Sequence, residues 1–311
     1  MLERMRPQLD IYGPQGTRAY LRNALAYTYT QLGAPYRVTE FHFHPDVAPP
    51  LPSTSLPPAA HEIVGPDIQP LAGEKHVWPA IEDPASLFTC QAGFIYHSVP
   101  CLGYVIQEPE VPGTIEPALY VPHLQRNAAA LGLKNPMTLL RQLQQGERIT
   151  LPDQHELLPP TPRRGRKLVL LGDTSDPSPM SSIMADPDVL VHEATNTFFR
   201  DLEPDAMDAA AFETKTKSHG HSTPDMAGRF ARRIGAKSLL LNHFSPRYAS
   251  TDTATMKVIA QRAADATADA SVPVLCAEDF MEVEVPLAAP SRIQGECRTP
   301  SRTVAPVYAA P

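Results

Sequence analysis

The chain has 311 residues, a formal net charge of −7, and 42% hydrophobic against 20% charged residues. This length is enough for one large domain with a substantial buried core, and no apolar run reaches the ~18 residues needed to span a bilayer. The negative charge disfavours a protein that binds nucleic acid over its whole surface, although local basic patches can still bind phosphate.

Cysteine usage and the N-terminal segment indicate an intracellular protein. The cysteines Cys90, Cys101, Cys276 and Cys297 show neither CxxC spacing nor the density of a disulfide framework. We therefore predict reduced thiols, as in reducing compartments. The first twenty residues lack the apolar core and small-residue cleavage site of a secretory signal.

The first half of the chain contains short predicted elements separated by a Pro-rich stretch at 45–60. Helical spacing of apolar residues predicts a helix over 17–32. VTEFHFH, which ends at His44, reads as a strand. Further along, we expect a strand pair and two helices at 92–97, 103–107, 123–132 and 136–145.

After Pro162 the pattern changes to apolar strands that alternate with helices. The strings KLVLLGD, DVLVHEA, SLLLNHF and VPVLCAED are near-continuous apolar runs, which are typical of strands covered on both faces. Helices are predicted over 224–234 and 253–268. We therefore expect an α/β layered fold over residues 1–286. Residues 287–311, rich in Pro, Ala, Ser and Arg, are predicted to be a disordered tail.

Three of these strands end in residues that can bind a metal or transfer a proton. KLVLLGD ends in Asp173, DVLVHEA in His192 and Glu193, and SLLLNHF in His243. A turn-forming Asp or a capped His would explain any one of them. Because ligand sites in α/β sheets lie at the carboxyl ends of the strands, three in succession favour a shared site.

A fourth segment, HGHSTP, leads into the helix predicted at 224–234. Thr223 suits the N-cap and the following Pro the first turn. His219 and His221 would then precede a helix N-terminus, which favours an anion such as phosphate. Alternatively, Ser222 and Thr223 only cap the helix and the histidines are solvated.

His97, which ends the strand predicted at 92–97, would alone be a structural histidine. Together with Asp173 and His243 it suits Zn²⁺ or Mn²⁺ in a hydrolytic site. Basic candidates for phosphate contact are Lys215, Lys217, Arg247 and the run from Arg163 to Lys167, for which a solvated face is the alternative.

The segments YHSVPCLGY, KLVLLGDTSD, DVLVHEAT, HGHSTPDMAGRFARRIGAKSLLLNHFSPRY and AEDFMEVEVP resemble the successive motifs of ribonuclease Z, in that family's order. IYGPQGT at 11–17 is similar to another family segment. The resemblance runs over roughly residues 11–285 and is most specific around 168–248.

The resemblance implies a metallo-β-lactamase-like αββα sandwich that holds two zinc ions. His97 would bind the first zinc, His243 the second, and Asp173 would bridge them. His221 would donate a proton to the leaving 3′-oxygen or hold the phosphate, and Glu193 would orient it. The resemblance thus implies a hydrolase, an endoribonuclease that removes the 3′ trailer from precursor tRNA.

Further implications concern the substrate and its partners. His219, Ser222, Thr223 and Arg247 would contact the substrate phosphates. Residues 109–150 resemble the family's tRNA-binding arm, with an ordinary helix pair as the alternative. The resemblance also implies a homodimer, and a location in the cytosol, the nucleus or an organelle, with no membrane contact.

The sequence departs from the family at its most diagnostic motif, HxHxDH, which normally precedes the IYGP segment. It is absent from these 311 residues, and the N-terminal sheet is expected to be incomplete. His42-Phe43-His44-Pro45-Asp46 has a similar form but follows IYGP and lacks the final His, so we interpret it as a strand.

Of the expected metal ligands, His97, Asp173 and His243 remain, which predicts weakened zinc binding and impaired cleavage. The chain is then either a truncated form of an active nuclease or a degenerate paralogue. The alternatives are a non-catalytic protein that binds tRNA or pairs with an active subunit, and a hydrolase of this fold that acts on a small molecule.

Overall fold

The computed structural model describes residues 8–48, 56–82, 87–203, 208–248, 252–287 and 294–296. The chain divides into two compact units. The first comprises Met1–Ile106 and Lys167–Pro311, and the second comprises Gln107–Arg166.

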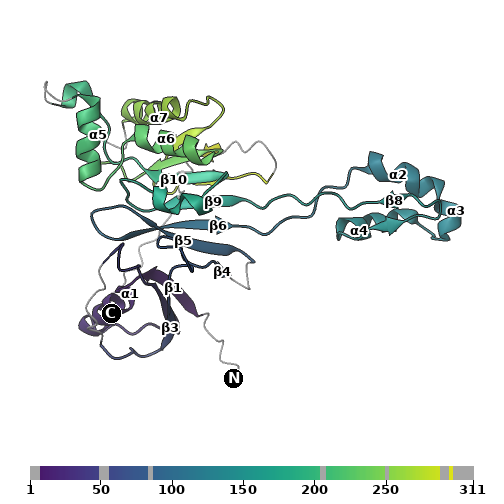
Figure 1. Ribbon diagram of the computed structural model, residues 1–311, viewed down its shortest axis with the longest axis horizontal. Coiled ribbons are helices and arrows are strands. Elements are labelled where there is room, and N and C mark those ends of the chain that lie inside the picture. Colours follow the sequence, from purple (N-terminus) through teal and green to yellow (C-terminus); the bar gives the residue numbers. More distant parts are fainter. Residues whose placement is uncertain are drawn as a thin grey trace, which may run out of the picture. The chain divides into compact units, whose positions relative to one another are not determined.

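A mixed sheet forms the centre of the first unit (Figure 1). Its described strands follow the order β12-β11-β10-β9-β6-β5-β4. The first four are parallel and are β12 (Val274–Cys276), β11 (Leu239–Asn242), β10 (Val189–Glu193) and β9 (Lys167–Leu171). The others are β6 (Cys101–Gln107), β5 (Thr89–Ile95) and β4 (Ile81–Glu82). The four apolar runs predicted as strands are therefore confirmed, as is the strand pair before them, although Leu170 of β9 is exposed and β12 is only partly buried.

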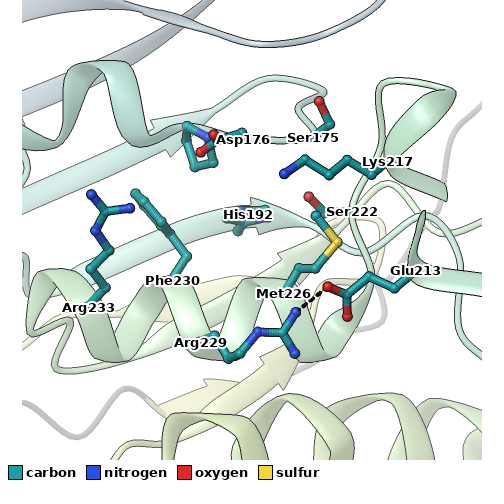
Figure 2. A pocket seen from close by; sticks show the side chains of 11 residues that line it. Ser175, Asp176, His192, Glu213, Lys217, Ser222, Met226, Arg229, Phe230 and Arg233 are labelled. Atoms are coloured by element: carbon teal, nitrogen blue, oxygen red, sulfur yellow. Dashed lines mark hydrogen bonds and ion pairs between the residues drawn. The ribbon is translucent and has the colours of Figure 1, made fainter. Parts of the chain in front are cut away.

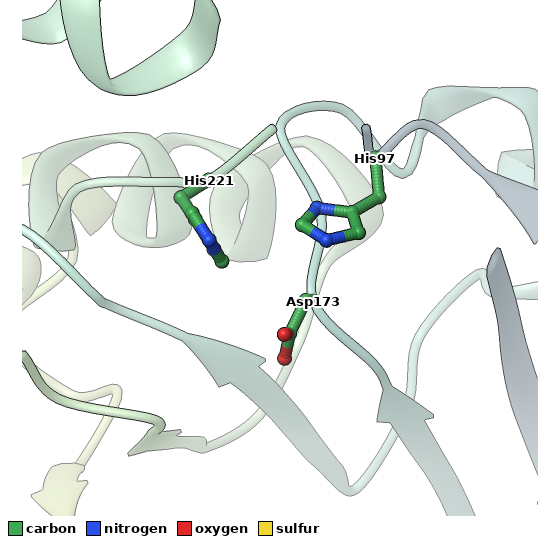
Figure 3. Close-up of side chains that lie close together, drawn as sticks. All are labelled: His97, Asp173 and His221. Atoms are coloured by element: carbon green, nitrogen blue, oxygen red, sulfur yellow. The ribbon is translucent and has the colours of Figure 1, made fainter. Parts of the chain in front are cut away.

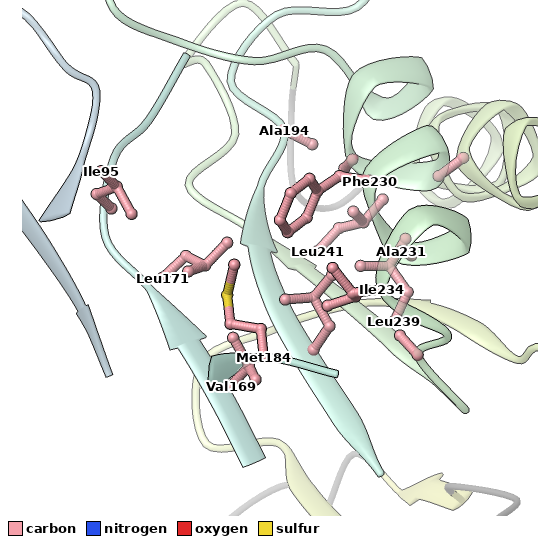
Figure 4. Packing of buried hydrophobic residues seen from close by; sticks show 14 of the residues in the cluster. Ile95, Val169, Leu171, Met184, Ala194, Phe230, Ala231, Ile234, Leu239 and Leu241 are labelled. Carbon is pink, nitrogen blue, oxygen red and sulfur yellow. The ribbon is translucent and has the colours of Figure 1, made fainter. Parts of the chain in front are cut away.

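Helices α6 (Pro224–Ile234) and α7 (Thr253–Thr267) cover one face of this sheet, and α5 (Ala209–Ser218) precedes them in the chain. Figure 4 shows Phe230 and Ile234 of α6 packed against Leu239 and Leu241 of β11 in the main core cluster. The predicted helices at 224–234 and 253–268 are confirmed. Short 3₁₀ helices occur at η2 (Ser178–Ile183) and η3 (Arg200–Leu202).

A second, parallel sheet lies under the first and consists of β1 (Leu9–Pro14), β2 (Tyr36–Phe41) and β3 (Glu62–Ile68). Phe41 of β2 packs with Phe94, Leu102 and the buried Trp78, which joins the two sheets. Helix α1 (Thr17–Tyr27) covers the outer side. These layers confirm the predicted αββα arrangement.

One sequence prediction in this layer is wrong. The strand expected through His44 ends at Phe41. Trp78 Nε1 donates to the His42 carbonyl over 3.1 Å, and the following residues turn away from the sheet. The predicted helix at 17–32 is also shorter, because α1 ends at Tyr27.

The second unit has its own small core. Its elements are α2 (Pro117–Arg126), α3 (Ala128–Leu131), η1 (Pro136–Thr138), α4 (Leu139–Gln144), β7 (Ile149–Thr150) and β8 (Glu156–Leu157). Their apolar side chains form one cluster, with Tyr120, Leu124, Leu143, Leu151 and Leu157 at its centre. The helices expected at 123–132 and 136–145 are present with shifted boundaries.

The C-terminal stretch predicted as a tail contains β14 (Gln294–Glu296), which pairs with β13 (Glu282–Glu284). Residues 288–293 and 297–311 lie outside the described residues, as do 49–55 of the Pro-rich stretch. Across the described ranges, no helix has the length and apolar character of a membrane span.

Three cysteines of the described chain, Cys90, Cys101 and Cys276, are free thiols. Burial raises the pKa of all three, and that of Cys276 to about 11. Thiolates are therefore scarce at neutral pH. Cys297 lies outside the described residues.

Candidate metal centre

The carboxyl ends of the parallel strands bring the predicted site residues together. Asp173 follows β9, Glu193 ends β10, and His243 follows β11. Because these strands are parallel neighbours, their ends lie at one edge of the sheet. His97 reaches the same edge from the end of β5, and His221 from the segment before α6.

Three imidazoles gather around the carboxylate of Asp173. The ring centroids of His97 and His221 are 4.9 Å apart, and those of His221 and His243 are 5.4 Å apart. Candidate ligand atoms of His97, Asp173 and His221 lie within 4.8 Å of one another, and Figure 3 shows both rings beside the carboxylate. His243 Nε2 lies 3.3 Å from Asp173 Oδ2.

The hydrogen bonds of these rings define their tautomers. His97 Nδ1 is 2.8 Å from the Gly220 carbonyl, and His221 Nδ1 is 2.9 Å from Glu193 Oε1. Carbonyl and carboxylate oxygens only accept, so both Nδ1 atoms carry the hydrogen. In the neutral rings Nε2 then keeps its lone pair, which is the form that binds a metal.

Thr195 sets the third ring in the same way. Its hydroxyl donates to Glu193 Oε2 over 2.5 Å, so it accepts from His243 Nδ1 at 2.7 Å. His243 Nε2 is thereby left free on the side of Asp173. No role was predicted for Thr195 from the sequence, although a threonine two residues after Glu193, at the end of a predicted strand, was the available signal.

Glu193 holds His221 directly and His243 through Thr195, and it is 1% exposed. Besides the two side chains above, its carboxylate accepts backbone N–H groups of Thr174 at 2.7 Å, Thr195 at 3.2 Å and Ser222 at 3.0 Å. These donors come from the loops after β9 and β10 and from the segment before α6. A buried carboxylate with this many donors has its hydrogen-bonding capacity satisfied and connects all three segments.

Backbone conformation at the site requires particular residues. Gly220 has φ +88°, and an added Cβ would lie 2.6 Å from both His97 Nδ1 and the Ser98 backbone nitrogen. Only glycine fits there without moving His97. His243 itself has φ +55°, a left-handed conformation that costs energy and is concentrated at functional sites.

The predicted phosphate contacts have more varied surroundings. Ser222 donates its hydroxyl to the Thr174 carbonyl at 2.6 Å, and Thr223 caps α6 by accepting from the Met226 N–H. Both are buried. Arg247 forms an ion pair with Glu203, whereas His219 is exposed at the end of α5.

A second group that could hold a metal, Glu40, His42 and Asp67, lies in the sheet of β1–β3. Arg18 already occupies it, since its guanidinium lies 2.8 Å from Asp67 and 3.6 Å from Glu40. A cation between the carboxylates disfavours a metal there. His44 is separate and lies 3.6 Å from Asp46.

The donors around Asp173 fit a zinc ion. Catalytic zinc typically has three protein ligands and bonds of about 2.0–2.2 Å to nitrogen and oxygen. His97, Asp173 and His221 offer two free Nε2 atoms and one carboxylate, and their Nδ1–H groups already have acceptors inside the protein. This arrangement is the outer-sphere support that metal-binding histidines require.

The fold and the site identify the class: a layered α/β sandwich with histidines and an aspartate at the ends of its strands. Comparison with known proteins identifies the family. The chain is 31% identical over 295 residues to the bovine zinc phosphodiesterase ELAC protein 1, and the match covers 90% of the chain and 75% of that protein. It is 30% identical over 254 residues to a ribonuclease Z of Streptococcus suis, with coverage of 80% and 64%.

The chain therefore belongs to the ribonuclease Z family, which confirms the sequence resemblance. It spans three quarters of the bovine relative and less than two thirds of the streptococcal one. The crystal structure of the short form of human tRNase Z is 24% identical, with a TM-score of 0.49 and coverage of 89% of this chain and 68% of that one. No family model matches the chain.

Proposed function

We propose that this protein is a zinc-dependent endoribonuclease of the tRNA 3′-processing type by descent, and that this chain alone is severely impaired. One observation carries the proposal: three imidazoles with internally bonded Nδ1–H groups surround Asp173, which is the donor set of a metal centre. The relatives' names, zinc phosphodiesterase and ribonuclease Z, support zinc and a phosphodiester substrate.

In this proposal the metal ligands are His97, Asp173 and His243, as the family resemblance implies, and His221 lies close enough to share an ion with His97 and Asp173. Bound zinc would neutralise the scissile phosphate and lower the pKa of a coordinated water. Asp173 contributes the negative charge that a divalent cation requires. The HxHxDH motif, which would supply the family's other metal ligands, is absent from these 311 residues. This absence is the reason for the predicted impairment of the chain.

His221 has the chemistry of the leaving-group acid. Glu193 accepts its Nδ1–H at 2.9 Å, which fixes the ring and leaves Nε2 available for proton transfer. The protonated ring can then donate from Nε2 to the leaving 3′-oxygen. Its place beside His97 also allows it to act as a metal ligand, and Glu193 would orient it in either role.

Cleavage of a precursor tRNA with a 3′ trailer, in excess zinc, tests the proposal. We expect slow cleavage at the trailer junction that is lost in Asp173→Asn, with Asp201→Asn, on the exposed η3, as the matched control. Cleavage that Asp173→Asn leaves unchanged would overturn the assignment of this site.

The second candidate is a non-catalytic protein that binds tRNA or pairs with an active subunit. Residues 109–150, which resemble the family's arm and lie within the second unit, Gln107–Arg166, would provide the tRNA contact. Tight tRNA binding with no detectable cleavage would favour this candidate. Removal of 112–162, between the Val111–Arg163 bridge residues, should then abolish the binding.

A further inference from the structure

Two neighbouring hollows lie beside the candidate metal centre and are continuous with each other. One, of about 270 Å³, begins at Tyr96 and His97. The other, of about 290 Å³, extends along α6 as far as Arg233. Both are lined by Ser175, Asp176 and Lys217, so they form one groove that starts at His97.

Positive charge predominates in this groove. Figure 2 shows Lys217 extending over the hollow between Ser175 and Ser222, with Arg229 and Arg233 along α6. Arg229 is neutralised by Glu213 at 2.6 Å. In the described part of the chain, neither Lys217 nor Arg233 takes part in an ion pair. Of the acidic residues that line this hollow, Glu213 is paired with Arg229, and Asp176 carries the remaining negative charge.

An aromatic side chain stands at the end of the groove next to the metal centre. Tyr96 is 47% exposed, and its ring is held edge-on against Phe94 at 5.0 Å. An exposed ring that is fixed from behind offers a flat face to a nucleic-acid base. Cations that follow a backbone together with stacking aromatics are the features by which proteins bind single strands.

The size of the groove selects the ligand. Each hollow lies near the lower limit of small-ligand pockets, about 300 Å³. It therefore has room for single nucleotides in sequence but not for a duplex. In a precursor tRNA the unpaired strand next to the cut is the 3′ trailer, whereas the acceptor stem is double-stranded.

We propose that this groove binds the single-stranded 3′ trailer, with Lys217 and Arg233 on its phosphates and Tyr96 stacked on a base. This inference rests on the proposed function, because it places the scissile phosphate at His97. It also separates Lys217 from Lys215, which the sequence analysis treated alike, since only Lys217 lines the groove.

Binding of a fluorescent single-stranded eight-nucleotide RNA, followed by anisotropy over a series of salt concentrations, tests the groove directly. Lys217→Gln and Arg233→Gln should each weaken binding roughly 3- to 10-fold and reduce the salt slope by about 0.7. The matched controls are Lys215→Gln on α5 and Arg232→Gln on α6, which remove the same charges from exposed positions outside the groove.

The controls should bind within twofold of the wild type. Equal losses of RNA affinity in the groove variants and their controls would show that only the net charge matters and would overturn the proposal. Unchanged RNA affinity in both groove variants would also overturn it. Tyr96→Leu gives a second, uncharged test and should weaken binding without changing the salt slope.

Precursor tRNAs with short and long trailers separate this proposal from the proposed function. Lys217→Gln should lower affinity only for the long trailer. If the RNA oligomer binds through the groove but no precursor is cleaved, the groove stands and the proposed function fails. If the precursor is cleaved while all groove variants bind normally, the groove proposal fails and the function stands.

Discussion

Glu193 shows how a single side chain organises the site. Its carboxylate accepts from three backbone N–H groups, the Thr195 hydroxyl and His221 Nδ1 while being almost completely buried. Each of these donors would lose its partner if the acceptor were removed. The orientation of His221 and, through Thr195, of His243 therefore depends on this carboxylate.

Replacement of Glu193 by Gln should destabilise the fold. The amide NH₂ would face at least one N–H donor, and leaving a buried donor without an acceptor costs about 1–3 kcal/mol. Urea unfolding should show this loss in the free energy of unfolding with an unchanged m value. Glu213→Gln, which breaks only the outer pair with Arg229, should cost less than about 1 kcal/mol. Equal costs for the two variants would contradict this account of Glu193.

Gly220 gives a second prediction at this scale. Gly220→Ala suffers both from φ +88° and from a Cβ that would lie 2.6 Å from His97 Nδ1. Gly146→Ala has nearly the same φ, +89°, but meets nothing within 4 Å. We expect Gly220→Ala to be the less stable variant by about 1–3 kcal/mol and to lose zinc affinity, measured by unfolding and by zinc titration. Similar values for both would mean that His97 does not depend on Gly220.

At the residue level the sequence predicted which side chains lie together, and the family resemblance implied that Glu193 orients His221, but nothing in the sequence indicated how His97 and His243 are held. Strand ends and the segment before α6 identified Asp173, Glu193, His221 and His243, since parallel strands must end at one edge. The role of Thr195 depends on hydrogen bonds between loops that are distant in sequence. No periodicity or motif spacing encodes those contacts.

Among the elements, α6 was the most predictable. Thr223 caps it, Pro224 occupies its first turn, and Gly235 ends it at φ +69°. Local signals of this kind act within a few residues, so the predicted limits 224–234 agree with the structure. The strand expected through His44 failed because its end is set by the packing of Trp78, which is far away in sequence.

The contact of α6 with α7 yields a prediction whose sign is decided by sterics. Gly228 packs against α7, where an added Cβ would lie 2.2 Å from the Ala263 carbonyl oxygen. Helix propensity alone would favour Gly228→Ala by about 1 kcal/mol. Because a backbone atom cannot move aside cheaply, we expect a net loss of about 1–3 kcal/mol. Thermal unfolding should show a lower Tm for Gly228→Ala and little change for Arg232→Ala on the exposed face, whereas a stabilised Gly228→Ala would contradict this packing.

For the whole molecule, the sequence predicted the α/β class because apolar strand runs and helix caps are local and abundant, whereas the αββα layers were implied by the resemblance to ribonuclease Z. The division into two units depends on which apolar side chains meet. The second core, around Leu124 and Leu143, is formed by residues whose helical pattern is interrupted by Pro122 and by the turns around Asn127 and Asn135. Only the tertiary contacts show that these pieces form a separate cluster.

The central claim is that the residues around Asp173 form a partial zinc site. Zinc titration of the metal-free chain, with bound metal counted by mass spectrometry, tests it most directly. We predict at most one zinc per chain, lost in Asp173→Asn and retained in Asp67→Asn, which alters only the group occupied by Arg18. Two tightly bound zinc ions, or zinc that survives Asp173→Asn, would contradict the account.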